Sequence, residues 1–267
     1  MSAPRVAERI AARLRNDESL LRKRWIESTP VPHFVVDELL PPHDIEEVFR
    51  KCPATSLLEK KQSLRESKWV GVELERYDPL IGDHLLAFQD PEVIHAIGAI
   101  TGNEALEPDP SLYASGISVM EQGDFLNPHI DNSHDGDQKQ YRVLNLLYYV
   151  SPGWNLANGG NLELWTPDLK TPTVVESCFN RLVVMGTTNK SWHSVRRVTA
   201  AARRVCLSNY YFSDVPFGGE VYRNVTSFRG RPEETMKRIL LRVDSAFLNA
   251  IGKLFPFLLT RNKHRRK

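Results

Sequence analysis

The chain contains only three cysteines in 267 residues, and their arrangement excludes two common uses of cysteine. Cys52, Cys178 and Cys206 form no CxxC motif and are odd in number. Cysteine-based zinc sites need closely spaced pairs, and disulfide-stabilised secreted domains usually have an even set. The sequence therefore predicts reduced thiols, a cytoplasmic location and no cysteine-ligated zinc.

The chain also lacks long apolar runs and a dominant charge. No apolar stretch is long enough to span a bilayer, and the N-terminus has no apolar run of signal-peptide length. The sequence therefore predicts neither a transmembrane segment nor a signal peptide. The formal net charge is +2, and the seven residues 261–267 alone carry five Lys and Arg side chains. Because the remainder is slightly acidic, we expect no nucleic-acid partner.

With 41% hydrophobic and 25% charged residues, the composition is that of an ordinary globular protein. A chain of this length can bury a full core without metal or disulfide. Any metal site is therefore expected to serve chemistry rather than folding.

The first part of the chain has mainly helical patterns. Residues 6–27 combine helical spacing with many charges and predict one or two solvated helices, whereas 33–37 reads as a short strand. Helices are also expected at 41–49 and 91–102, the second ending at a glycine. We expect residues 1–110 to form a helical N-terminal region that braces the core.

From Ser111 onward, short β-type segments follow one another, separated by turn residues such as those at 158–160. Six or more strands at this spacing predict a jelly roll, that is, a double-stranded β-helix, over residues 111–215. The fold class expected is α+β, with supporting helices before this core and one helix after it. The predicted strands are 116–120, 142–150, 161–165, 173–175, 181–185 and 203–212.

Residues 216–267 are expected to form an amphipathic C-terminal helix followed by a basic tail. We expect the apolar stripe of this helix to pack on the barrel or on a second subunit. Docking of the stripe and the tail on a membrane surface is the alternative. The stripe consists of Met236, Leu240, Val243, Phe247, Ile251, Leu254 and Leu258.

The segment that indicates chemistry is an HxD pair, His129 and Asp131. On an extended strand, side chains at i and i+2 project from the same face, so both could bind one cation. The pair is a weak signal by itself, because such spacing often arises by chance. A third ligand would have to come from elsewhere in the fold.

A second histidine, His193, supplies that ligand, and the basic pair Arg203-Arg204 follows about ten residues later at the start of a strand. Two imidazoles and one carboxylate on one face of a metal leave three positions open, which is typical of iron(II) oxygenases. A keto acid can take two of these positions and dioxygen the third. The remote carboxylate of the keto acid then needs a fixed cation, and arginine offers a bidentate one.

Six stretches together resemble one known family. In order and spacing, residues 113–213 are similar to the prolyl-4-hydroxylase-like branch of the Fe(II)/2-oxoglutarate oxygenases, which includes the oxygen-sensing prolyl hydroxylases. The stretches are 128–132, 142–149, 159–164, 179–184, 192–195 and 204–212.

The resemblance implies that His129, Asp131 and His193 bind Fe(II) and form the catalytic centre. It also implies that Arg204 anchors the 2-oxoglutarate carboxylate and that Tyr149 supports it. One position departs from the family, because Met120 stands where a tyrosine often lies. The presence of Asp131, instead of glycine or alanine, disfavours halogenase chemistry.

Arg203 is the alternative anchor, and strand alternation favours Arg204. Arg204 shares its face with Ser208 and other small or polar residues, whereas Arg203 shares its face with apolar residues typical of a barrel wall. Asn145 points the same way as Tyr149 by the same alternation. We therefore place Ser208 and Asn145 in the cofactor pocket.

The function implied is hydroxylation of an unactivated C–H bond, using Fe(II), 2-oxoglutarate and O2, with 2-oxoglutarate decarboxylated to succinate and ascorbate as a supporting reductant. The substrate would be a small metabolite, a sugar or lipid-linked intermediate, or a prolyl residue, the last including a protein prolyl hydroxylase specific for one protein. Two other classes stay open: a jelly-roll metal-binding or sensing module without turnover, and a cupin-type metalloenzyme that uses no keto acid. Neither the substrate nor the oligomeric state follows from the sequence.

Overall fold

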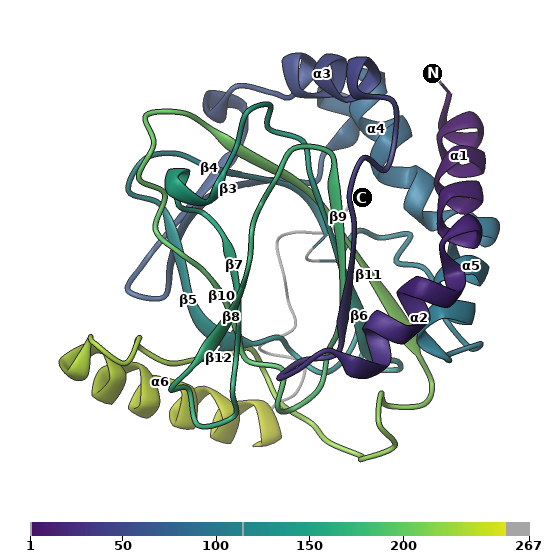
Figure 1. Cartoon of the computed structure of the whole chain (residues 1–267). Helices are drawn as coiled ribbons and strands as arrows, with labels where there is room; N and C mark the ends of the chain where they lie inside the picture. Colours follow the sequence, from purple (N-terminus) through teal and green to yellow (C-terminus); the bar gives the residue numbers. More distant parts are fainter. Residues whose placement is uncertain (1, 114, 255–267) are drawn as a thin grey trace.

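The computed structural model describes residues 2–113 and 115–254 (Figure 1). The described residues form one antiparallel sheet of twelve strands and six α-helices. The helices are α1 Ala3–Asn16, α2 Glu18–Glu27, α3 Pro42–Lys51, α4 Pro79–Leu86, α5 Pro91–Thr101 and α6 Thr235–Leu254. The strands are β1 His33–Val36, β2 Glu59–Gln62, β3 Glu66–Gly71, β4 Gly116–Met120, β5 Phe125–Ile130, β6 Tyr141–Tyr149, β7 Leu162–Trp165, β8 Pro172–Val175, β9 Arg181–Gly186, β10 His193–Val195, β11 Arg204–Ser213 and β12 Ser227–Phe228.

The sheet is curled, with strand order β1-β9-β6-β11-β4-β3-β5-β10-β7-β8; β2 pairs with β3, and β12 pairs with β5. The non-consecutive neighbours are crossovers between two halves, one centred on β6 and β11 and the other on β5 and β10. This architecture confirms the predicted α+β jelly-roll fold. All six strands predicted between residues 116 and 212 are present within one or two residues of their expected bounds.

The main hydrophobic core lies between the first half of the sheet and helices α1 to α5, which gather against it (Figure 1). In β11, Val205, Leu207 and Tyr211 are buried in this core. The alternate residues, including Arg204 and Ser208, line the interior of the barrel. The two faces of β11 therefore separate as strand alternation predicted.

The N-terminal helices are less solvated than expected. Val6, Ile10 and Leu14 of α1 are completely buried in the main core. These positions recur every three or four residues, so the helix has one apolar face and carries its charges on the other. The sequence predicted one or two solvated helices over residues 6–27; the helices form, but α1 is solvated on one face only.

Residues 1–110 also contribute strands to the sheet, not helices alone. β1, which was predicted, pairs with β9. β3 was not predicted, yet it pairs with both β4 and β5 and so joins the two halves of the sheet. Residues 59–71 are mostly charged or polar and show no clear apolar alternation, so tertiary pairing rather than local preference made them strands.

The C-terminal helix α6 forms as expected, but its apolar stripe does not face the barrel. Leu241 and Ser245 are buried, and Ser245 exchanges hydrogen bonds of 2.8 and 2.9 Å with the backbone of Phe228 in β12. Val243 and Phe247 are each 65% exposed. The contact with the barrel is thus made by an adjacent, partly polar face of the helix. The side chains of residues 249–254, Leu258 and the basic tail lie outside the described residues.

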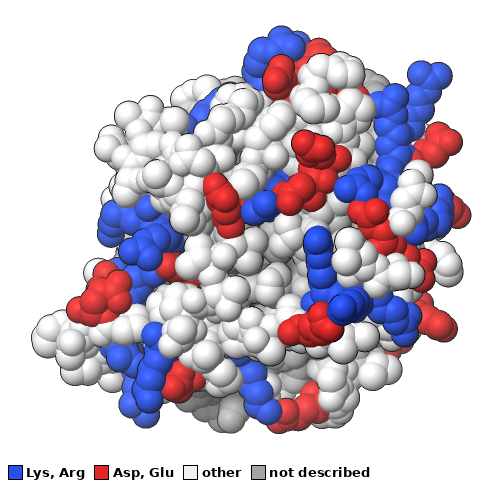
Figure 2. Space-filling view, viewed as in Figure 1, with Lys and Arg blue, Asp and Glu red and all other residues white. Residues whose placement is uncertain are grey.

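Within the described ranges, no helix is both long and apolar enough to cross a membrane. On the face drawn in Figure 2, basic and acidic side chains are interspersed rather than gathered by sign.

Candidate metal and co-substrate site

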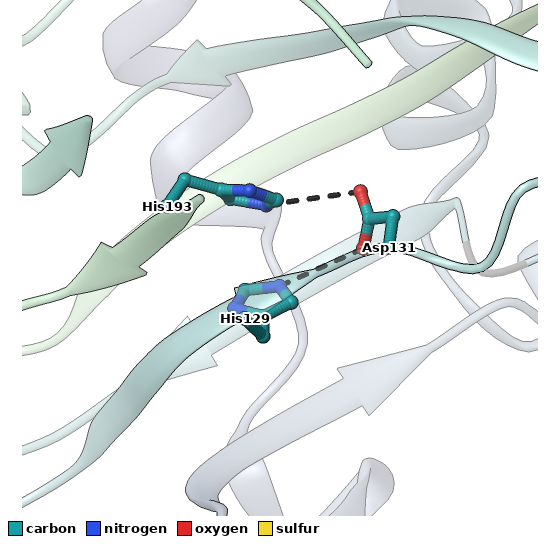
Figure 3. Close-up of side chains that lie close together, drawn as sticks. All are labelled: His129, Asp131 and His193. Atoms are coloured by element: carbon teal, nitrogen blue, oxygen red, sulfur yellow. Dashed lines mark ion pairs between the residues drawn. The ribbon is translucent and has the colours of Figure 1, made fainter. Parts of the chain in front are cut away.

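His129, Asp131 and His193 converge inside the barrel, as Figure 3 shows. Nε2 of His129 lies 3.6 Å from Oδ1 of Asp131, and Nε2 of His193 lies 3.7 Å from Oδ2. His129 and His193 are direct partners in the register of β5 and β10, which brings two residues far apart in the sequence side by side. Asp131 lies just beyond the end of β5, on the same side as His129.

The backbone sets the orientation of both imidazoles. Nδ1 of His129 lies 3.0 Å from the carbonyl oxygen of Asn127, and Nδ1 of His193 lies 3.0 Å from that of Ser191. A carbonyl only accepts, so each Nδ1 carries a proton and donates it. In the neutral ring each Nε2 then has a free lone pair, and both lone pairs are turned toward Asp131. Outer hydrogen bonds of this kind are usual behind histidines that bind metals.

Electrostatics favour a cation at this point. Burial raises the pKa of Asp131, but the neighbouring His193, His129 and Arg142 outweigh burial and hold it well below its usual range. Burial and the nearby His129 lower the pKa of His193 to about 4, so its ring is neutral at pH 7. Oδ2 of Asp131 is buried without a hydrogen-bond partner among the described residues. Two imidazoles and an ionised carboxylate with an unsatisfied oxygen fit a divalent iron.

Residues from three other segments support the two histidines. The ring of Phe228 in β12 stacks on His129, with centroids 5.1 Å apart. Beside His193, Ser194 donates a 2.6 Å hydrogen bond to Glu163 of β7, and Arg231 pairs with the same carboxylate at 2.6 Å. Glu163 is only 1% exposed, so its charge requires this partner. Sequence reasoning missed this support, because Phe228 and Arg231 lie beyond the predicted core.

A cavity of about 480 Å³ surrounds the triad and is lined by both halves of the sheet. Arg204, Asn145 and Ser208 line it, as expected for pocket residues. Tyr149 does not line it and lies behind Arg204, whose guanidinium sits 4.7 Å from the centre of the tyrosine ring. Burial raises the pKa of Tyr149 to about 12, offset in part by the Arg204 charge.

Of the two candidate arginines, the structure turns only Arg204 into the cavity. Its Nε donates to Oγ of Ser177 at 3.2 Å, and its Nη1 lies 3.7 Å from Sδ of Met120, the residue found where the family often has tyrosine. Gly160 makes room for the Arg204 side chain, since a Cβ on Gly160 would come within 2.6 Å of Cδ of the arginine. Arg203 points outward and donates to carbonyl oxygens at the end of α3, at 2.9 to 3.3 Å.

Arg142 is the cavity residue that strand alternation could not find. By simple alternation it would share the helix-facing side of β6 with Leu144 and Leu146. The register of β6 and β11 shifts between Tyr211 and Phe212, where Val143 is the extra residue. This bulge reverses the alternation and turns Arg142 into the cavity.

Residues 115–212 match the family model described as the 2OG-Fe(II) oxygenase superfamily. A search of curated proteins found no match.

Solved prolyl hydroxylases have a similar fold. A prolyl-4-hydroxylase from Pseudomonas putida has a TM-score of 0.54 and 17% identity, covering 72% of this chain and 98% of that one. A prolyl 4-hydroxylase from Phytophthora capsici has a TM-score of 0.53 and 17% identity, covering 92% and 78%. A prolyl hydroxylase from Trichoplax adhaerens, solved with a peptide of hypoxia inducible factor, has a TM-score of 0.52 and 17% identity, covering 75% and 92%. At this identity the likeness establishes the fold.

Proposed function

Through residues 115–212 the chain belongs to the 2OG-Fe(II) oxygenase superfamily, and from that premise we propose that it hydroxylates an unactivated C–H bond. The observation that carries the proposal is the convergence of His129, Asp131 and His193 on one point in the cavity. When bound, Fe(II) and 2-oxoglutarate supply the oxidation by O2, with 2-oxoglutarate decarboxylated to succinate.

The chain's own residues bind, orient and exclude water. His129, Asp131 and His193 would hold the iron, with the two imidazoles fixed by backbone carbonyl oxygens. Arg204 would bind the remote carboxylate of 2-oxoglutarate, and Tyr149 would support Arg204 by packing under its guanidinium. Asn145 and Ser208 would line the space beside it. Ascorbate as a supporting reductant stays an expectation.

The test is an anaerobic titration of the metal-free protein with Fe(II) and then with 2-oxoglutarate. A weak visible charge-transfer band should appear only when both are present, and it should be absent in His129→Ala. A folded protein that binds iron but gives no band with 2-oxoglutarate would favour a cupin-type enzyme without a keto acid. A band without succinate release in air, for any substrate offered, would favour a sensing module.

A prolyl residue is the second candidate substrate beside a small metabolite. It is favoured by the fold shared with three prolyl hydroxylases, one of them solved with a bound peptide. A fold alone does not select a substrate. Succinate release stimulated by proline-containing peptides, but not by matched peptides with alanine in place of proline, would support the peptide substrate.

We also propose that α6 docks on an anionic membrane surface. Met236, Ile239 and Leu240 are 73, 57 and 54% exposed and lie on one face with Val243 and Phe247. The basic side chains of the same helix, among them Arg238 and Arg242, complement anionic lipid, and its Asp244 is already paired with Arg65. Figure 2 shows white and blue side chains, with some red ones among them, along the lower-left edge, over α6. An apolar face with basic flanks is the pattern of an interfacial helix.

Val243→Glu combined with Phe247→Glu should weaken sedimentation with phosphatidylserine-containing vesicles at least tenfold, because it places two charges where apolar side chains would be buried. Ile26→Glu is the matched control, since Ile26 is 72% exposed on another helix, α2, and should have no effect. Absence of vesicle binding in the unaltered protein, together with dimerisation that the double variant abolishes, would assign the face to a second subunit instead.

The cytoplasmic location, the absence of a nucleic-acid partner and the division at residues 110 and 215 stay predictions. The cysteines Cys52, Cys178 and Cys206 are all free thiols in the structure.

A further inference from the structure

Arg142 is a cation buried in the cavity that holds the triad. Its side chain is 1% exposed, and its guanidinium lies 3.9 Å from the centre of the Tyr210 ring. The rings of Tyr113 and Phe212 lie 5.6 and 5.9 Å from the same guanidinium. These aromatic faces shield the charge from water and hold the group in place.

The hydrogen-bonding capacity of this guanidinium is largely unused. Nε and Nη2 of Arg142 are buried without a partner among the described residues. The carboxylate beside it is Asp131, whose Oδ1 lies 3.7 Å from Nη1, beyond hydrogen-bond distance. The oxygens of Asp131 are also turned toward His129 and His193. A buried cation left in this condition is costly unless a ligand completes it.

The edge of Arg142 formed by Nε and Nη2 is the same edge with which Arg65 of this protein binds a carboxylate. In Arg65, the same pair of atoms, Nε and Nη2, binds Asp244 at 2.8 and 2.5 Å. A bidentate fork of this kind matches a carboxylate or a phosphate in both spacing and charge. In Arg142, a residue that lines the cavity, the same fork carries no acidic side chain.

The other basic side chains that line the cavity already have a partner or an assigned ligand. Lys61 and Lys68 pair with Glu59 and Glu66 at 2.6 and 3.0 Å. Arg223 is exposed at the surface and donates to Gln138 at 2.9 Å. Arg204 is assigned to 2-oxoglutarate under the proposed function.

We infer that Arg142 binds an anionic group, a carboxylate or a phosphate, of the primary substrate. This rests on the proposed function, because it takes the triad as the metal site and Arg204 as the anchor of 2-oxoglutarate. Arg142 is close to Asp131, so the anionic group lies close to the metal, and the carbon oxidised is only a few bonds from it. The substrate class is therefore a compact anionic metabolite rather than an internal segment of a protein.

The test uses the full chain loaded with Mn(II), which does not start turnover, and saturating 2-oxoglutarate. Calorimetric titration with formate, acetate and inorganic phosphate should detect binding of at least one anion, whereas neutral acetamide should not bind. Arg142→Gln should weaken anion binding at least tenfold. Arg223→Gln, which removes a surface arginine at the same cavity, should leave the binding within twofold.

Three outcomes would overturn the inference. The first is that no anion binds to the unaltered protein. The second is that Arg142→Gln lowers Mn(II) affinity while anion binding is unchanged, which would limit Arg142 to positioning Asp131. The third is that Arg142→Gln weakens the binding of 2-oxoglutarate itself as much as that of the added anion. If the glutamine variant does not fold, Arg142→Lys keeps the charge but lacks the fork, and should bind the anion at least threefold more weakly. The Fe(II)/2-oxoglutarate band tests the proposed function in a separate experiment. The anion titrations are interpreted without reference to that band.

Discussion

His193→Ala is expected to reduce Fe(II) affinity by more than about 100-fold and to abolish succinate formation. Loss of a residue that only hydrogen-bonds to a metal ligand typically lowers metal affinity about 10- to 100-fold. His193 is a direct ligand in the proposed site, so its loss should cost more. No other described histidine, cysteine or carboxylate groups with His129 and Asp131 in a possible metal cluster, so no substitute ligand is at hand. Equilibrium titration with Fe(II) under anaerobic conditions measures the loss.

His84→Ala is the matched control for this experiment. His84 is also buried, and its Nδ1 also lies close to a backbone carbonyl oxygen, 2.9 Å from that of Leu80. It belongs to α4, outside the barrel, and should affect stability but not iron binding. Full iron-dependent turnover in His193→Ala would disprove the assignment of the triad.

Arg204→Ala should weaken 2-oxoglutarate binding by about 2–5 kcal/mol, roughly 30-fold or more, while Fe(II) affinity changes little. Truncating one partner of a buried charge pair costs about this much, because the other charge is left without compensation. Arg204 is 3% exposed and no described carboxylate pairs with it, so its charge is available for the co-substrate. The dissociation constant of 2-oxoglutarate, from the chelate band, is the measurement.

Arg203→Ala tests the alternative anchor one residue away. Arg203 donates to three carbonyl oxygens near the end of α3 and stacks on Phe49, so its loss should lower the free energy of unfolding by about 1–3 kcal/mol. It should leave 2-oxoglutarate affinity unchanged. If Arg203→Ala weakened 2-oxoglutarate and Arg204→Ala did not, the two assignments would have to be exchanged.

The membrane experiment is independent of these two, whereas the anion experiment takes the triad and Arg204 in the roles that these two test. α6 contacts the barrel through Leu241 and Ser245, and its exposed stripe lies on another face. Arg142 lies on β6, on the opposite side of the cavity wall from the core that stabilises the fold. The membrane prediction can therefore fail without removing the others, and the anion prediction can fail without removing the triad or Arg204.

What the sequence by itself determined is local. The spacing of His129 and Asp131 places them on one side of the chain, and alternation along β11 turns Arg204 inward and Arg203 outward. A glycine signal sets the end of α5, where Gly102 has a φ of 72°. All these depend on periods of two or 3.6 residues and on single-residue backbone preferences, which neighbouring residues alone decide.

Only the tertiary structure decided the features that join distant segments. A one-residue bulge at Val143, set by pairing with β11, turned Arg142 into the cavity against the alternation. β3 forms a strand because it pairs with both β4 and β5. Arg231, which lies beyond the predicted core, forms an ion pair with Glu163. The apolar stripe of α6 likewise did not reveal which face would meet the barrel. Pairing, register and long-range charge contacts depend on which surfaces meet after folding, and periodicity within one segment carries no information about its partner.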